Sequence, residues 1–284
     1  MQLETQAFWL PKAGNSAEEY EDAVAYSPEQ DLYAVADGAS ESSFADRWAQ
    51  ILVRQFAATP PLNMTSESEW LSWLAPLRQE WHDGIPWDVL PWYAEEKARQ
   101  GAHATLLGVK VFPAVPSAFK RFLRKAAFWR SGSDDLPTRP YTAVTVGDTC
   151  LFQIRGSELI ESFPLKRSQE FTARPILVGS GLEEERPVRI FPPRLIKGSL
   201  SPGDTLLLVT DALAFWLLER FESGARPWEL LQRVDSQKNF SVLVSQLRKG
   251  KTLKNDDTTL LRLHWPATRS STLLGARLQK GVSS

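Results

Sequence analysis

The sequence predicts an α+β protein, in which antiparallel strand pairs are combined with separate amphipathic helices. Two apolar runs, Ala23–Tyr26 and Leu32–Asp37, are joined by the turn-forming segment 28–31 and predict a hairpin. Segment 141–155 is predicted to form two strands joined by a tight turn at Gly147-Asp148. After a turn at 156–158, the strand-like run 159–163 continues this antiparallel meander. Other segments carry apolar residues at the spacing of a helix.

Composition limits the class of protein. The 284 residues are 43% hydrophobic and 24% charged, which suits one large globular domain or two small ones. The formal net charge of -1 gives no general attraction to nucleic acid or anionic membrane. Cys150 is the only cysteine, which excludes an internal disulfide and a cysteine-rich zinc site. Without a signal-peptide pattern or a bilayer-length apolar run, we expect a soluble cytoplasmic protein.

The N-terminal third contains the most distinctive stretch. A short strand is expected at Phe8–Leu10, and the strand Leu32–Asp37 ends in a carboxylate followed directly by Gly38. An aspartate there suits a hard cation, although this stretch alone favours an ordinary Asp-Gly turn. Ser43 with Asp46 predicts a capping box. The helix that follows would bury one face: Phe44, Trp48, Leu52 and Phe56, with Ala45, Ala49 and Val53 beside them.

A second helix is predicted after the break at Thr59–Pro61. Ser66 with Glu69 again suggests a capping box. Its apolar stripe could be a ligand platform, but we interpret it as core packed against the sheet near the first helix. The stripe consists of Trp70, Trp73, Leu74, Leu77 and Trp81. Another helix is expected at 92–100, followed by a strand over 101–112.

Segment 113–140 is predicted to be an insertion between two paired strands. It has four prolines and a basic, aromatic centre, which fits either a solvated amphipathic helix or a partner surface. Beyond it, Thr205–Thr210 has the continuous apolar run of a buried strand and ends at Asp211. Helices are expected at 212–221, 228–234 and 241–248, a last strand at 260–265, and a polar tail after it.

Acidic residues repeatedly lie next to apolar strands. Asp37, Asp148, Asp211 and Asp256 share this position, and Glu21-Asp22 forms a further cluster. If they converge on one sheet edge, bound cations would relieve their repulsion. Oxygen ligands without Cys or paired His favour Mg²⁺ or Mn²⁺ over Zn²⁺. Two such ions could generate hydroxide and clamp a phosphate.

The order of these motifs resembles the metal-dependent protein phosphatases, the PPM or type 2C family, in its bacterial form. The matching pieces cover about residues 8–265: Glu21-Asp22-Ala23, Val35–Gly38, Gly101–Gly108, Val146–Thr149, Gly203–Asp211 and Asp256–Thr259. The resemblance implies a four-layer α-β-β-α sandwich of two antiparallel sheets flanked by helices. The phosphatase domain would span residues 1–266, including the insertion at about 113–140, and residues 267–284 would form the polar C-terminal tail.

The resemblance also implies a role for each acidic position. Asp37 would bridge two Mg²⁺ or Mn²⁺ ions, and the Gly38 carbonyl would bind the first. Asp211 and Asp256 would complete the second and form the catalytic set with Asp37. Asp22, and by extension Glu21, would hold metal-bound waters. Asp148 matches the aspartate that holds a third metal in the family.

Several positions depart from the family pattern. Ala212 replaces the usual Gly after Asp211, and Phe215 stands where an acidic residue often assists the third metal, which favours two ions. Ala39 replaces the histidine of eukaryotic members. The usual phosphate-binding Arg is missing, and Lys12 is the nearest basic residue but a poor substitute by spacing. His103 is interpreted as structural.

These observations support three hypotheses. The first is a Mg²⁺/Mn²⁺-dependent serine/threonine phosphoprotein phosphatase that uses a dinuclear centre and metal-bound hydroxide. The second is a pseudophosphatase that binds a phosphorylated partner without hydrolysis, which the missing Arg favours. The third is an unrelated metal-dependent hydrolase or a structural protein. In the first two cases the partner is a phosphorylated protein, with neither nucleic acid nor membrane involved.

Overall fold

The computed structural model describes residues 2–116, 136–182 and 193–267. The centre of the predicted insertion at 113–140 and residues 268–284 of the predicted tail lie outside these ranges. At the described edges of the insertion, Val115 and Thr138 pair as an isolated antiparallel bridge. Within the described part of the chain, no helix is both long enough and apolar enough to cross a membrane.

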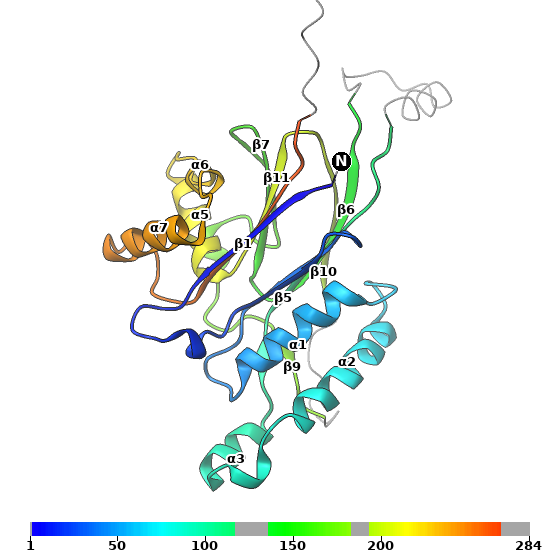
Figure 1. Ribbon diagram of the computed structural model, residues 1–284, viewed down its shortest axis with the longest axis vertical. Coiled ribbons are helices and arrows are strands. Elements are labelled where there is room, and N and C mark those ends of the chain that lie inside the picture. The colour runs from blue at the N-terminus through cyan, green and yellow to red at the C-terminus, as the bar shows by residue number, and fades with distance from the viewer. Residues whose placement is uncertain (1, 117–135, 183–192, 268–284) are drawn as a thin grey trace, which may run out of the picture.

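Two antiparallel sheets of five strands each form the centre of the molecule (Figure 1). The first sheet has the order β1 (Glu4–Leu10), β12 (Thr258–His264), β11 (Asp204–Val209), β7 (Cys150–Arg155) and β8 (Glu158–Phe163). The second has the order β10 (Arg194–Leu200), β6 (Arg139–Val146), β5 (Leu106–Val111), β3 (Leu32–Ala36) and β2 (Ala23–Ser27). A small two-stranded sheet pairs β4 (His103–Ala104) with β9 (Val178–Gly179). The predicted hairpin is confirmed as the β2–β3 pair.

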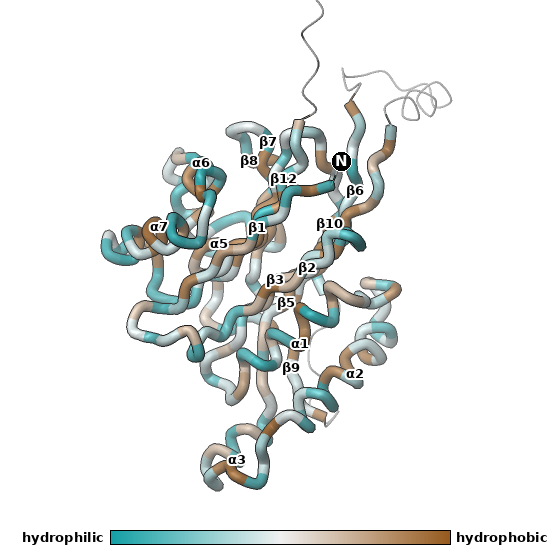
Figure 2. The backbone as a smooth tube through the Cα atoms, viewed as in Figure 1, coloured by the Kyte–Doolittle hydropathy of each residue, from teal (hydrophilic) through white to brown (hydrophobic). Residues whose placement is uncertain are grey.

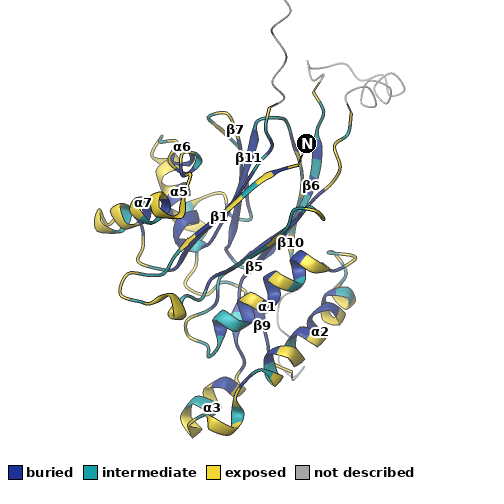
Figure 3. Cartoon of the chain, in the orientation of Figure 1, coloured by how far each residue is buried: buried dark blue, intermediate teal, exposed yellow. Residues whose placement is uncertain are grey.

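Helices cover the outer face of each sheet. On the second sheet lie α1 (Ala45–Ala58) and α2 (Glu67–Asp83), and α3 (Trp92–Arg99) follows them. On the first sheet lie α5 (Asp211–Glu222), α6 (Trp228–Gln232) and α7 (Gln237–Lys249). The strands are largely buried, and the helices expose their outward faces (Figure 3). The predicted four-layer α-β-β-α sandwich is confirmed.

The alternation of side chains along each strand explains how one chain fills three apolar cores. In β3, Tyr33 and Val35 point into the core between the two sheets, where Leu261 of β12 also lies. Ala34 and Ala36 point to the opposite face and belong to the core beneath α1. Both faces of the strand are therefore apolar, and brown segments follow the central strands in Figure 2. Such a strand has to lie in the middle of layers.

The predicted start of the first helix is wrong by one residue, and the predicted capping interaction at its N-terminus is absent. Helix α1 begins at Ala45, and Phe44 is its N-cap residue with φ 58°, so Ser43 and Asp46 form no capping box. The preceding turn explains the difference, because Ser42 N donates to the Ala39 carbonyl at 2.8 Å and fixes the chain before the helix. Tertiary constraints thus override the local capping signal.

The tryptophan stripe of α2 is buried, as predicted from its spacing. All five members have relative exposures of 9% or less: Trp70, Trp73, Leu74, Leu77 and Trp81. The stripe packs against α1, where Trp73 meets Phe56 edge-to-face with ring centroids 6.4 Å apart. The indole of Trp81 donates to the Phe44 carbonyl at 3.2 Å. At the start of α2, the Ser66 hydroxyl accepts from Glu69 N, which is one half of the predicted capping box. The other half is replaced, because Ser66 N donates to the Asn63 carbonyl at 3.1 Å.

The sequence suggested that the turn at Gly147-Asp148 closes a hairpin, and this prediction is wrong. β6 belongs to the second sheet and β7 to the first, so this turn carries the chain from one sheet to the other. Gly147 adopts φ 103°, and a side chain there would collide with Thr105, so glycine is required. The crossing places Asp148 between the ends of the two sheets. The β7–β8 pair does continue as an antiparallel meander.

Candidate metal centre

Asp37 is fixed where β3 ends. Its backbone N–H donates to the Thr105 hydroxyl at 2.9 Å, and its carbonyl accepts from Thr105 N at 2.8 Å. The same Thr105 hydroxyl lies 2.5 Å from the hydroxyl of Thr149, which belongs to the crossing turn. Two threonines therefore lock the end of β3 to the link between the sheets, which orients the Asp37 and Asp148 segments relative to each other.

Gly38 allows the backbone to pass close to two other segments. Its N–H donates to the Glu21 carbonyl at 3.2 Å. A Cβ at this position would lie 2.7 Å from the Glu21 carbonyl oxygen and 3.0 Å from the Ala45 carbonyl group. Because both neighbours are backbone, they cannot move aside cheaply, and only glycine fits here.

Asp22 lies immediately before β2 and is only 2% exposed. Its Oδ2 accepts from the hydroxyls of Thr259, at 2.6 Å, and Thr210, at 3.0 Å. Its Oδ1 is buried and has no hydrogen-bond partner among the described residues. Burial raises the pKa of Asp22, and the charge of Asp257 adds to this effect. A buried carboxylate oxygen without a donor is costly, and a cation or a cation's water shell would satisfy it.

Asp211 and Asp256 share one lysine. Asp211 is the first residue of α5, and its Oδ1 accepts from Ala212 N at 2.5 Å. Lys254 Nζ lies 2.6 Å from Asp256 Oδ2 and 3.5 Å from Asp211 Oδ2. This lysine brings two acidic segments together that are far apart in sequence. Sequence analysis missed it, because a lone lysine in a polar loop carries no signal of its own.

Arg248 of α7 supports the loop that carries Asp256. Its guanidinium donates to the Pro11 carbonyl at 2.6 Å, to the Thr258 hydroxyl at 2.9 Å and to the Asp256 carbonyl. Burial lowers the pKa of Arg248, while the nearby aspartates oppose that shift. The arginine therefore anchors the loop to the end of β1 from behind. It is a second supporting residue that sequence analysis missed.

The aspartates act on one another through their charges. Burial raises the pKa of Asp37 well above its usual range, and the charges of Asp22, Asp211, Asp148 and Asp256 raise it further. All five carboxylates therefore lie within one electrostatic cluster. Among the described residues, no group of three or more His, Cys, Asp or Glu side chains is arranged so that it could hold a metal ion. That these residues bind metal stays a prediction.

Glu21 and Lys12 lie at the edge of this cluster. Lys12 Nζ is 3.8 Å from Glu21 Oε2, although spacing alone made Lys12 a poor candidate. The Glu21 side chain also accepts from the Ser40 hydroxyl, and burial raises the pKa of Glu21. Asp257 joins both segments, because its carboxylate accepts from Lys12 N at 2.8 Å and from Glu21 N at 2.7 Å. Lys12 is thus the basic side chain placed beside the acidic pair.

The positions that depart from the family lie around the centre. Phe215 is on the outer part of α5 and packs against Phe171, with ring centroids 5.7 Å apart. Ala39 N donates to the His103 carbonyl at 2.9 Å, and His103 N donates to the Ser42 hydroxyl at 3.1 Å. The backbone of His103 therefore holds the turn after Gly38, in line with a structural role.

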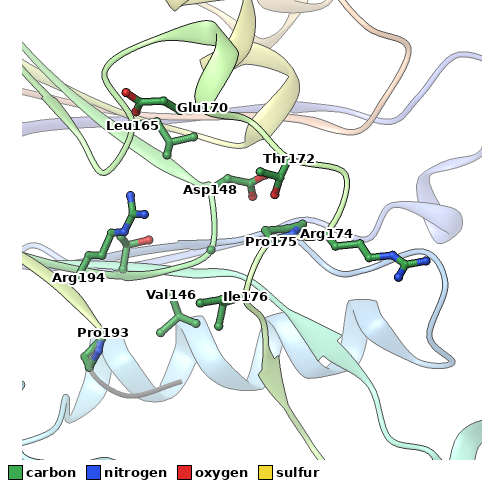
Figure 4. Close-up of a pocket in the computed structure, with 12 residues that line it drawn as sticks. Val146, Asp148, Leu165, Glu170, Thr172, Arg174, Pro175, Ile176, Pro193 and Arg194 are labelled. Atoms are coloured by element: carbon green, nitrogen blue, oxygen red, sulfur yellow. The ribbon is translucent and has the colours of Figure 1, made fainter. Parts of the chain in front are cut away.

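A pocket of about 210 Å³ opens beside Asp148 (Figure 4). In the view, the Asp148 carboxylate points toward Thr172, and Ile176 lies with Val146 on the opposite wall. Two arginines also line it, Arg174 and Arg194. The close-up shows Arg174 directed away from Asp148, whereas Arg194 borders the pocket from the start of β10. The pocket therefore gives an outside molecule access to one end of the aspartate cluster.

Solved structures with the same architecture identify the fold. The Mycobacterium tuberculosis serine/threonine phosphatase PstP/Ppp matches with 15% identity, a TM-score of 0.57, and coverage of 94% of this chain and 100% of that chain. The chain has the fold of the PPM-type serine/threonine phosphatases. No protein-family model and no curated protein matches it by sequence.

Two further matches extend the comparison of this PPM-type fold. The catalytic domain of PstP in complex with two manganese ions matches with 15% identity and a TM-score of 0.54, covering 93% of this chain and 98% of that chain. PppA, described as a key regulatory component of T6SS in Pseudomonas aeruginosa, matches with 18% identity and a TM-score of 0.51 over the same shares. At these identities the likeness shows the fold.

Without divalent ions, this protein should be more stable at about pH 5 than at about pH 7.5. Burial raises the pKa of Asp148 from its ordinary 3.8 to about 6, and the charge of Asp211 adds to this. The native state then binds more protons than the unfolded chain between these values, so the free energy of unfolding falls as pH rises through about 6. Urea unfolding in chelator should show a loss of about 1.4 kcal/mol between these two pH values.

Asp148→Asn provides the control for this pH dependence. The variant lacks the titrating carboxyl, so its stability should change less between the two pH values than that of the natural protein. His103 works in the opposite direction, because burial lowers its pKa and acid then destabilises the fold. Equal stability at both pH values, or greater stability at the higher one, would contradict the expected sign.

Proposed function

We propose that this protein is a Mg²⁺- or Mn²⁺-dependent serine/threonine phosphoprotein phosphatase. The observation that carries the proposal is the position of Asp37, half-buried at the end of β3 beside Gly38. Burial and the charges of four other aspartates raise its pKa. A fold has no structural reason to keep so many like charges together, since each pair costs stability. Divalent cations would convert that repulsion into binding.

The chemistry of the residues fits hard divalent ions. The side-chain donors are carboxylate oxygens, Gly38 offers a carbonyl in a passage that only glycine can take, and Asp22 Oδ1 is buried without a partner among the described residues. Asp37, Asp211 and Asp256 would hold the ions, with Asp22 and Glu21 behind them. Bound Mg²⁺ or Mn²⁺ would neutralise the phosphate and activate water for in-line attack at phosphorus.

The protein's own residues would position the reactants. Thr210 and Thr259 hold one oxygen of Asp22, and the other oxygen has no hydrogen-bond partner among the described residues. Lys12 lies at the edge beside Glu21 and can attract a phosphate dianion as a point charge. The pocket beside Asp148 would receive the part of the phosphoprotein next to the phosphorylated side chain.

A specific observation favours a second candidate function. Lys254 already offsets part of the charge of Asp211 and Asp256, so these carboxylates have a partner even without metal. A pseudophosphatase that binds a phosphorylated partner without hydrolysing it could keep the cluster in this form. The two functions differ in one measurable property, which is turnover in the presence of Mn²⁺.

Hydrolysis of p-nitrophenyl phosphate and of a phosphoserine peptide should therefore require Mn²⁺ or Mg²⁺. Chelator should abolish the activity, and added Mn²⁺ should restore it. Asp211→Asn should lower kcat by at least about a hundredfold, because the amide would bind less tightly the divalent ion that neutralises the phosphate in the transition state. Asp235→Asn, which removes the same charge from an exposed site before α7, should leave kcat unchanged. Binding of the phosphopeptide without turnover would instead favour the pseudophosphatase.

A further inference from the structure

Lys254 occupies an unusual place for a positive charge. Its ammonium lies 2.6 Å from Asp256 and 3.5 Å from Asp211, two residues that are predicted to hold a divalent ion. The side chain is 62% exposed, so its end can leave the carboxylates without disturbing the core. A cation that is already present must move, or share its partners, when a second cation arrives.

The backbone that directly follows Lys254 is held in place. The Asn255 side chain accepts from Ala13 N at 2.7 Å and donates to the Ala13 carbonyl at 3.1 Å. Arg248 donates to the carbonyl of the next residue, Asp256. The loop therefore keeps Lys254 beside the aspartates, and only the four-carbon side chain is free to swing. The lysine is a fixed part of this end of the cluster rather than a passing surface contact.

We propose that Lys254 is a built-in cation that pairs Asp211 with Asp256 and competes with the divalent ion for them. This inference rests on the proposed function, because it assumes that these aspartates bind metal. Without metal, the ammonium relieves the repulsion between the two carboxylates and keeps their segments together. When Mn²⁺ binds, the ammonium is displaced, and the cost of displacement lowers the affinity of this end of the centre. Lys254 thereby sets the metal concentration at which the centre fills.

Metal binding provides a test that does not depend on activity. The full chain is freed of metal with chelator, dialysed and titrated with MnCl₂ in a calorimeter, as the natural protein and as Lys254→Met. Methionine keeps the length of the side chain and removes its charge. Removing a competing ion pair of this exposure should tighten Mn²⁺ binding roughly three- to tenfold. Lys254→Arg keeps the charge and should not tighten binding.

The control for net charge is Lys249→Met at the end of α7, where an exposed lysine is removed near the same loop. It should bind Mn²⁺ as the natural protein does. Thermal unfolding adds a second readout: Lys254→Met should unfold at a lower temperature in chelator, because the aspartates lose their partner. It should also gain more from saturating Mn²⁺, since tighter binding to the native state stabilises it more.

The outcomes separate this inference from the proposed function. Tighter binding in Lys254→Met supports the inference, and so does binding in Lys254→Met when the natural protein binds no Mn²⁺. Equal or weaker binding in Lys254→Met than in Lys249→Met overturns the inference but leaves a metal-dependent phosphatase in place. Failure of both the natural protein and Lys254→Met to bind Mn²⁺ overturns the inference together with the proposed function.

Discussion

Asp37→Asn is expected to abolish most phosphatase activity and to raise the thermal stability of the metal-free protein. The amide keeps the shape of the side chain but cannot supply a charged ligand. The value of kcat for p-nitrophenyl phosphate should therefore fall about a hundredfold or more, which corresponds to a loss of about 3 kcal/mol or more of transition-state stabilisation. The stability change has the opposite sign. Burial and four neighbouring aspartates raise the pKa of Asp37. A neutral group at this position therefore removes a desolvation cost and a charge repulsion that destabilise the native state at neutral pH.

Asp204→Asn is the matched control for this pair of effects. Asp204 is a fully buried aspartate and the first residue of β11, whereas Asp37 is half-buried at the end of β3. Its carboxylate is satisfied by Arg155 at 2.8 Å, Gln153 at 2.8 Å and the Ser201 N–H at 2.8 Å. Loss of its charge should weaken these bonds, lower stability and spare the chemistry. If Asp37→Asn were as active as the natural protein, or less stable in chelator, Asp37 would be structural and the proposed centre would be wrong.

The fold could be predicted where a local pattern has one physical explanation. The apolar run of β11 and the stripe of α2 both require burial, and both are buried. The turn at Gly147-Asp148 shows the limit of such reasoning. A glycine with positive φ can close a hairpin or carry the chain into another sheet, and only the packing of the two sheets decides between these. Similarly, the chain around Ser42 sets where α1 starts, so the cap that Ser43 suggested does not form.

In the candidate site, too, some residues could be recognised from the sequence and others could not. Aspartates next to apolar strands can be recognised in sequence, because a charge beside a buried strand needs an explanation. Their partners cannot be recognised in this way. Lys254 and Arg248 are ordinary basic residues until the fold brings them to Asp211 and Asp256. Thr210 and Thr259 could have been noticed as neighbours of the acidic motifs, but their shared bond to Asp22 crosses 188 and 237 positions of sequence.

Phe56→Ala is expected to lower the stability of the protein more than the neighbouring core substitution Gly108→Ala does. The ring is fully buried and joins α1 to two other elements, because it lies over Gly108 of β5 and meets Trp73 of α2 edge-to-face. Removing it should lower the free energy of unfolding by about 3–5 kcal/mol, as lost burial and a residual cavity add. Urea unfolding in chelator measures this change.

The contact with Gly108 makes the explanation testable through a double-mutant cycle. A Cβ at Gly108 would lie only 2.2 Å from the Phe56 ring, so Gly108→Ala alone should overpack the core and cost about 1–3 kcal/mol. In the Phe56→Ala background the same methyl group enters the vacated space, and Gly108→Ala should then cost much less or become stabilising. Because the two residues are in contact, the cycle should show a coupling of at least about 1 kcal/mol. Additive effects would mean that the ring does not rest on Gly108, and that the second sheet and α1 are joined by other contacts.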